Sequence, residues 1–107
     1  MPKASDEPVF YAAISLTDTG DVVAAVTGRK IRVLAGVVVI NGAQTIKFQS
    51  GTATDLTGAL PPGANGGVQI PFCPVGNFET VSGEKLRIVA SGAVGIAGWL
   101  VYQKVKP

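Results

Sequence analysis

The residues of this chain that could do chemistry are few. Asp18, in the triplet Asp18-Thr19-Gly20, could take part in acid–base catalysis if a second carboxylate lay beside it, because two close carboxylates share one proton. The chain has no histidine to act as a base for its single cysteine, Cys73. The only adjacent carboxylates are Asp6-Glu7, and no spacing typical of metal ligands is present. We therefore expect no catalytic site, no metal and no cofactor, and predict that the protein is not an enzyme.

The triplet Asp18-Thr19-Gly20 matches the signature of aspartic proteases, whose viral members are all-β homodimers of similar length. In those dimers, one such aspartate from each subunit forms the catalytic pair. Here Asp21 follows the triplet where those proteases usually have Ala or Ser, and their later Gly-Arg-(Asn/Asp) motif is missing. We predict instead a turn in which Asp18 bonds a nearby amide, and we keep the dimeric protease as a remote alternative.

The composition limits the kinds of partner. Charged residues make up 15% of the 107 residues, against about 25% in typical soluble domains, which is too few to cover an ordinary monomer surface. The net charge of +2 is small and mixed along the chain, so we expect neither nucleic acid nor a membrane as partner. A lone cysteine and a polar start without a signal peptide predict a protein made in a reducing cytoplasm. We expect Cys73 to pack at a strand end.

The hydropathy pattern predicts an all-β protein. Apolar and polar residues alternate in short stretches that are separated by 14 glycines and 7 prolines. We predict one antiparallel β-sandwich domain, residues 9–107, of about eight short strands, preceded by a flexible arm, residues 1–8. The strands are expected at Val9–Leu16, Val22–Val26, two within Ile31–Gln49, a short one at Leu56–Leu60, Val68–Phe72, Asn77–Val81, Glu84–Ala90 and Ala93–Val105, the last bent or bulged near Gly95 or Gly98.

The central stretch Ile31–Gln49 is predicted to be a β-hairpin. Asn41-Gly42 lies between its two apolar halves, and both residues tolerate the positive φ of a type I′ turn. A second pattern is an internal repeat, in which Gly28–Ala35 (GRKIRVLA) resembles Gly83–Ala90 (GEKLRIVA). We interpret these as equivalent strands of two Greek-key halves, which predicts a jelly-roll-like sandwich.

Two stretches are apolar on both faces, Val37–Ile40 and the strand that contains Trp99. One face of a sandwich strand normally meets water, so something must cover the outer face. We predict an oligomer interface formed by Val37, Val39, Trp99 and Val101. The alternative is that the long connection Ser50–Gly67 folds back over this face.

A series of short motifs resembles a group of small β-sandwich virion proteins of tailed bacteriophages, including head decoration (cement) proteins. The motifs run in order from Ala24 to Val105: GRKIRVL, KFQSGT, DLTG, ANGG, PFxPxGxFET, GExL and a closing GWLVY. Pro61-Pro62 departs from the pattern of this group, where a less rigid segment with Leu is usual. The resemblance implies a non-enzymatic capsid decoration protein that forms homotrimers on the outer surface of the head and binds the major capsid protein.

The resemblance also implies that the N-terminal arm or the long loop Ser50–Gly67 contacts the major capsid protein. The residues assigned to this contact are Pro2, Lys3, Asp6, Glu7, Asp55, Pro61 and Pro62. Asp55 could also bind an ion or a sugar hydroxyl, although a capped turn is the favoured interpretation. The alternative function is a tail or fibre protein or a receptor- or glycan-binding module, for which Tyr11, Trp99 and Tyr102 are the candidate aromatics.

Overall fold

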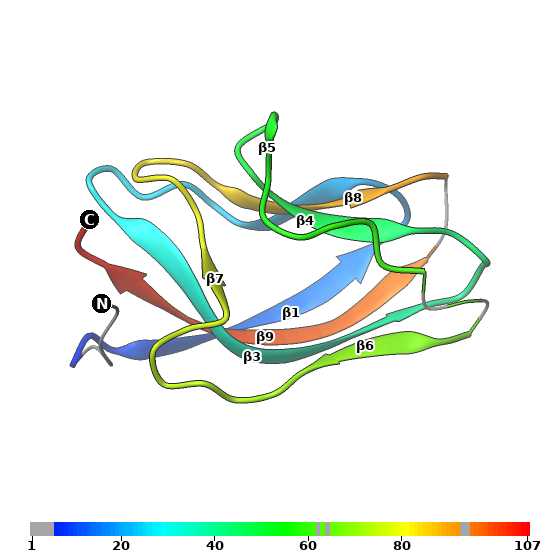
Figure 1. Cartoon of the computed structure of the whole chain (residues 1–107), viewed down its shortest axis with the longest axis horizontal. Coiled ribbons are helices and arrows are strands. Elements are labelled where there is room, and N and C mark those ends of the chain that lie inside the picture. The colour runs from blue at the N-terminus through cyan, green and yellow to red at the C-terminus, as the bar shows by residue number, and fades with distance from the viewer. Residues whose placement is uncertain (1–5, 62, 64, 93–94) are drawn as a thin grey trace.

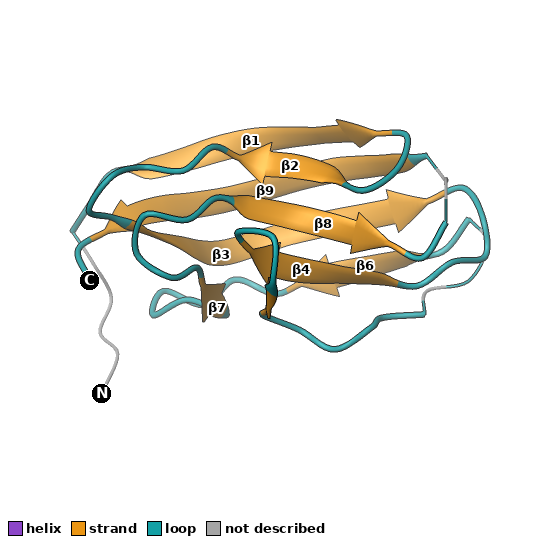
Figure 2. Cartoon of the chain, turned by 90° about the horizontal axis from the view of Figure 1, so that it is seen from above, coloured by secondary structure: helices purple, strands orange, loops and turns teal. Residues whose placement is uncertain are grey.

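The structure, a computed structural model, describes residues 6–61, 63, 65–92 and 95–107. The described chain is all-β, as predicted, and includes no helix that could cross a membrane. Two antiparallel sheets pack face to face (Figures 1 and 2). The strands are β1 (Val9–Leu16), β2 (Gly20–Val23), β3 (Lys30–Ile40), β4 (Ile46–Ser50), β5 (Thr54–Asp55), β6 (Gly67–Ile70), β7 (Phe78–Glu79), β8 (Leu86–Ala90) and β9 (Ile96–Val105).

The strand order is that of a jelly roll. Sheet A has the order β1-β9-β3-β6, with β7 also paired to β3, and sheet B has the order β2-β8-β4-β5. The pairs are nested, because β4 pairs with β5, β3 with β6, β2 with β8 and β1 with β9. The chain is therefore one long hairpin rolled into two layers, which is how a double-sheet jelly roll arises. Figure 1 shows that β1 begins and β9 ends at the same end of the sandwich.

The predicted hairpin at Asn41-Gly42 is wrong. The strands on either side of it, β3 and β4, belong to different sheets, so the chain crosses the sandwich at this point. Neither Asn41 nor Gly42 is among the described residues with positive φ, which a type I′ turn requires. Asn41 instead bonds Gly95, whose amide donates to Asn41 Oδ1 at 2.8 Å. The tight hairpin joins β4 to β5, and Gly51 provides its positive φ of 63°.

A β-bulge at Leu34 sets which side chains enter the core. The β3–β9 register shifts between Val33 and Ala35, which leaves Leu34 as the extra residue. Ile31 and Val33 therefore face the core before the bulge, and the even-numbered Val38 and Ile40 face it afterwards. The loop after β6 provides a hydrogen bond for the bulged residue, because the Cys73 amide donates to the Leu34 carbonyl at 2.9 Å. Of the bend or bulge expected near Gly95 or Gly98, a bulge at Gly98 is absent, because β9 keeps an unbroken register with β1 from Ile96 to Gln103.

The core lies between the two sheets and is formed by apolar side chains from both. Phe48 of sheet B is 1% exposed and packs against Phe78, with ring centroids 5.0 Å apart. β6 is shorter than the predicted strand Val68–Phe72, because it ends at Ile70 before Pro71, and Phe72 is 67% exposed. The largest side chains in the core besides Phe48 are Ile31, Ile40, Ile46, Leu86, Ile88, Ile96 and Leu100.

The internal repeat has a structural counterpart. Its leading glycines, Gly28 and Gly83, both have positive φ, 72° and 81°. They lie side by side, since the Gly83 amide donates to the Arg29 carbonyl at 2.9 Å. The strands that follow lie in opposite sheets and send matching residues into the core, Ile31 and Leu86 among them. The repeat thus marks two strands that start together and face each other across the sandwich.

Candidate interaction surface

The outer face of sheet A, the side turned away from sheet B, is uncharged over three successive rows. The register places these rows side by side across the sheet. They are Tyr11–Val101–Ala35, Ala13–Trp99–Val37–Gln69 and Ser15–Ala97–Val39–Gly67. We call these residues the outer face of sheet A. No row contains Asp, Glu, Lys or Arg, so the strands present an apolar surface.

Several large side chains of this face are open to solvent. Tyr11 is 67% exposed, Val39 42% and Trp99 37%. The described part of the Ser50–Gly67 connection does not cover them, because β5 pairs with β4 in sheet B and Leu60 forms a bridge with Ile46. The predicted strand at Leu56–Leu60 is thus replaced by the earlier β5 and this single bridge. The long loop, offered as an alternative cover, follows the edge of the other sheet.

Sheet B has the opposite character on its outer side. The row that crosses its four strands is Asp21–Arg87–Gln49–Asp55. The side chains form a polar ladder, in which Arg87 Nε donates to Gln49 Oε1 at 3.1 Å and Gln49 Nε2 donates to Asp55 Oδ1 at 2.8 Å. Lys85 adds an ion pair with Asp21 at 3.0 Å. Because such a ladder suits water and an apolar row does not, sheet A carries the surface suited to a protein partner.

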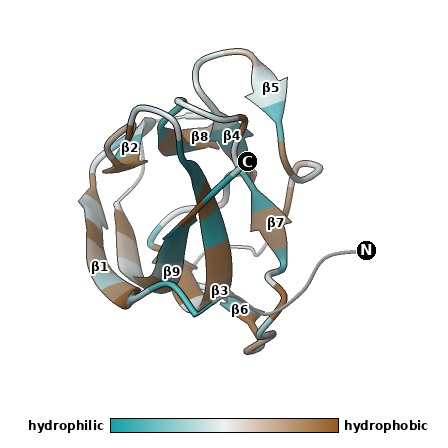
Figure 3. Ribbon diagram, turned by 90° about the vertical axis from the view of Figure 1, so that its left-hand side faces the viewer, coloured by the Kyte–Doolittle hydropathy of each residue, from teal (hydrophilic) through white to brown (hydrophobic). Residues whose placement is uncertain are grey.

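Charge also appears on sheet A, but only beyond the apolar rows. The next row along the strands includes Arg32 opposite Glu79, which form an ion pair, and Lys30 lies 3.8 Å from the same carboxylate. This end, where β3 begins and β9 finishes, faces the viewer in Figure 3 and is coloured as hydrophilic. The apolar rows therefore form a bounded patch with a charged border.

The four residues predicted as an oligomer interface lie together on this patch. Val37 pairs with Trp99 in one row, and Val101 and Val39 occupy the rows on either side. Tyr11 and Ala13 belong to the same surface, although the sequence pattern did not predict them as interface residues. The alternation within β1 could have found them, because Tyr11, Ala13 and Ser15 share the parity opposite to buried Ile14.

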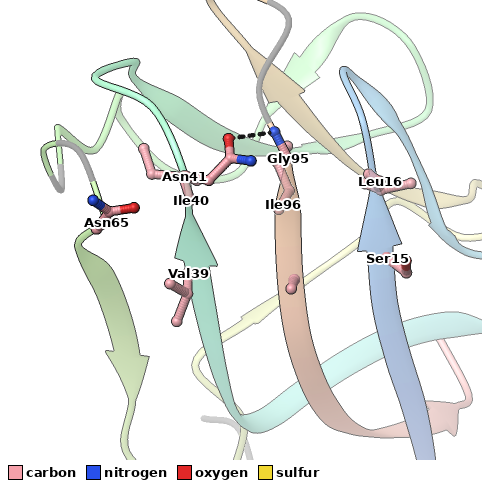
Figure 4. A pocket seen from close by; sticks show the side chains of 9 residues that line it. Ser15, Leu16, Val39, Ile40, Asn41, Asn65, Gly95 and Ile96 are labelled. Carbon is pink, nitrogen blue, oxygen red and sulfur yellow. Dashed lines mark hydrogen bonds between the residues drawn. The ribbon is translucent and has the colours of Figure 1, made fainter.

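A hollow of about 330 Å³ lies where the patch meets the end of the sandwich (Figure 4). Its lining residues are Ser15, Leu16, Val39, Ile40, Asn41, Asn65, Gly95, Ile96 and Ala97. Asn41 holds Gly95 across the top of the hollow, and Asn65 adopts a positive φ of 58° beside it. The described lining offers carboxamides but no titratable group and no aromatic ring, so it is suited to hydrogen bonding and not to stacking on a sugar.

The residues predicted to contact a capsid protein are not brought together. Glu7 is fixed at the charged end, where its carboxylate lies 3.1 Å from Arg29. Asp55 lies on sheet B, and Pro61 lines a separate hollow with Gln44. Asp6 is exposed near Glu7, whereas Pro2, Lys3 and Pro62 lie outside the described residues. The described members of this set therefore do not define one surface.

The Asp55 carboxylate already has partners within the chain. It accepts hydrogen bonds from Gln49 Nε2 at 2.8 Å and from Lys47 Nζ at 3.2 Å. These bonds, first from Gln49 and then from Lys47, hold the pKa of the Asp55 carboxyl below its ordinary value. The interactions connect β5 to β4, so the geometry supports a structural role for Asp55 in the hairpin.

The triplet Asp18-Thr19-Gly20 forms the turn between β1 and β2, as predicted. The Thr19 amide donates to Asp18 Oδ1 at 2.7 Å, and Asp18 is exposed. The Thr19 hydroxyl accepts a bond of 2.9 Å from the Ala90 amide of sheet B. Cys73 is partly buried in the loop beside the bulge. Among the described residues, no group of acidic or cysteine side chains could hold a metal ion.

Comparisons of the chain with protein-family models, with curated proteins and with solved structures find no match. The outer face of sheet A and the motifs of the sequence are therefore the features that indicate a function.

Proposed function

We propose that this protein is a non-enzymatic structural component of a tailed-phage virion, and specifically a head decoration protein that self-associates and binds the outside of the capsid. The observation that carries the proposal is the uncharged outer face of sheet A. Trp99, Val37 and Val39 lie there in adjacent rows, exposed or half-buried, in a chain that is poor in charge elsewhere. Burial of such a patch against another copy removes apolar surface from water and stabilises an assembly.

The two faces of the sandwich favour a defined orientation in such an assembly. The polar ladder of sheet B, with Asp21 and Lys85 paired at 3.0 Å, is suited to permanent contact with water. The outer face of sheet A is suited to contact with other copies. A homotrimer, the state implied by the resemblance, would bury this face around the trimer axis and leave sheet B outward. The major capsid protein is the further partner that this proposal assigns.

The test is to mix the purified protein with capsids that lack it and to image the particles by cryo-electron microscopy. We expect added density at three-fold or quasi-three-fold positions of the shell. Bare shells at saturating protein would overturn the head assignment and direct the search to the tail or fibre. A matched pair of variants sharpens the test, because Trp99→Asp alters the outer face of sheet A and Val89→Asp alters that of sheet B.

A glycan-binding module is the second candidate, and the hollow at Asn41 and Asn65 is the observation that favours it. Two carboxamides can bond sugar hydroxyls. The aromatics that would stack on a sugar lie elsewhere, however, since Tyr11 and Trp99 occupy the flat outer face and Tyr102 stacks on Phe10 at 5.6 Å. The outer face therefore gives the decoration role the stronger support.

A further inference from the structure

The edges of the two sheets differ in how they are protected against pairing with another strand. Sheet A ends at β1 and at β6, and sheet B ends at β2 and at β5. An edge strand has unpaired backbone groups that can bind a further strand. Soluble proteins block such edges with short strands, charges, prolines or bulges.

Three of these edges carry such devices. β6 has 4 residues and is followed directly by Pro71, which cannot donate to a ladder. β2 has 4 residues, contains Asp21 and has a register shift before Val23. β5 has 2 residues, one of which is Asp55. Each of these strands is thus too short, too charged or too irregular to accept a partner strand along its length.

Pro8 lies directly before β1, but the strand itself carries none of these devices along its length. β1 has 8 residues, VFYAAISL, without a charge or a proline. Among the described residues it pairs with β9 alone, and its register runs without a shift from Val9 opposite Gln103 to Leu16 opposite Ile96. Half of the backbone N–H and C=O groups of an antiparallel strand point away from its one neighbour. In β1 these groups face the open side of sheet A.

We propose that the free edge of β1 pairs with β1 of a second copy of this chain, so that two A sheets become one continuous antiparallel sheet. The choice of occupant follows from the other edges. A β1–β6 contact between copies would meet the short strand closed by Pro71, whereas β1–β1 joins the two open edges and leaves neither exposed. Such a two-fold contact closes on itself and does not propagate into fibres.

The register of this contact follows from the pleat. Side chains that face outward in one copy must lie beside outward side chains of the other. One residue of β1 therefore lies directly opposite its own copy, and the two-fold axis passes between these two equivalent residues. Axes at Ala12 or Ala13 keep nearly the whole of β1 paired. Small side chains at the axis permit close approach, and Tyr11 then lies near the axis on the outer side. The two outer faces become one larger apolar surface, continuous across the joint.

Cysteine cross-linking tests the contact directly. In a Cys73→Ser background, Ala12→Cys and Ala13→Cys are introduced singly, and the proteins are oxidised and run on a non-reducing gel. Directly opposite residues of an antiparallel pair have Cα atoms about 4.5–5.5 Å apart, within the range a disulfide spans. We expect efficient disulfide-linked dimers from one of the two variants. Thr54→Cys, exposed on β5 at the edge of sheet B and away from the outer face of sheet A, is the control and should remain mostly monomeric on the gel.

Hydrogen exchange and a charged variant provide independent measurements. Every second amide of β1, those that point away from β9, should gain protection as the protein concentration rises. Ala13→Lys should abolish this protection by placing like charges near the axis, whereas Thr54→Lys on sheet B should not change it. Dimer yields from both cysteine variants no higher than from Thr54→Cys would overturn the proposal. It would also be overturned if the β1 amides gained protection only when capsids were added.

This contact is separate from the burial of the outer face, and it does not depend on the virion assignment. Trp99→Asp changes the outer face and leaves the β1 backbone edge intact, so it should not reduce the cross-linking of the reactive cysteine variant. Failure of capsid binding with efficient cross-linking would reject the decoration role alone. Capsid binding without cross-linking would reject the β1 contact alone.

Discussion

The backbone of Gly98 lies against the carbonyl of Val37, so closely that a Cβ atom on Gly98 would be 1.9 Å from the Val37 oxygen. Gly98 also has a φ of 151°, which side chains other than hydrogen rarely permit. The contact lies in the β3–β9 pair, beside Trp99. It therefore fixes the spacing of the two central strands that carry the outer face of sheet A.

Gly98→Ala should destabilise the fold by at least about 2 kcal/mol, since the added methyl group meets backbone and the φ becomes strained. Urea unfolding followed by Trp99 fluorescence measures this loss. Gly58→Ala is the matched control, because nothing lies within 4 Å of its Cβ position and its φ is not positive. Equal stability of the two variants would contradict the close approach.

Trp99→Asp should reduce self-association while the fold is retained. Trp99 is 37% exposed, so the substitution removes little from the core but introduces a charge into an uncharged row. Sedimentation velocity over a range of concentrations measures the change. Val89→Asp on sheet B should sediment like the unmodified protein, and an unchanged assembly in Trp99→Asp would exclude this face as the interface.

Phe48→Ala should lower the free energy of unfolding by about 3–5 kcal/mol, the usual cost of truncating a buried phenylalanine. Phe48 is 1% exposed and contacts Phe78 from the opposite sheet. Phe72→Ala removes the same atoms from a side chain that is 67% exposed, and should change stability by no more than about 0.5 kcal/mol. Thermal unfolding of both variants provides the comparison; similar losses would place Phe72 in the core.

The Asp55 carboxyl should titrate at a pKa below its ordinary value, because Gln49 and Lys47 stabilise its charged form. A depressed pKa in the folded state contributes stability that is present above the unfolded pKa and is lost as the pH falls through the folded pKa. The β4–β5 hairpin should therefore loosen in acid. Carboxyl-carbon NMR titration checks this: Gln49→Ala should raise the pKa more than Lys47→Ala, and no change in Gln49→Ala would exclude the assigned cause.

The strands could be predicted because each half-buried stretch alternates, as from Leu86 to Ala90, but the pairing could not. Asn41-Gly42 is a strong local turn signal, yet a jelly roll uses the same position to cross between sheets. The chain crosses here because β3 and β4 join different sheets, and Asn41 bonds Gly95, which is far away in the sequence. The bulge at Leu34 is similarly hidden, since it depends on the loop amide of Cys73.

The surface could be predicted in part. Val37 and Trp99 stand out because their strands are apolar at both odd and even positions, whereas an ordinary sandwich strand has polar residues on its outer face. That they lie directly opposite each other follows only from the β3–β9 register. Tyr11 belongs to this surface only because β1 joins the same sheet as β9. Tyr11 and Trp99 are far apart in the sequence, so no local pattern indicates that they share a face.

The nested pairing also determines the order in which this chain can fold as it is made. Val9 finds its partner opposite Gln103, so the first strand to leave the ribosome has no neighbour until the last is complete. The β4–β5 turn can close early because its loop is short, whereas β1 must wait through most of synthesis. During that interval an uncharged strand is open on both edges, and nascent chains on one messenger lie close to each other. Less frequent initiation of translation, which spaces the nascent chains further apart, should therefore raise the soluble yield.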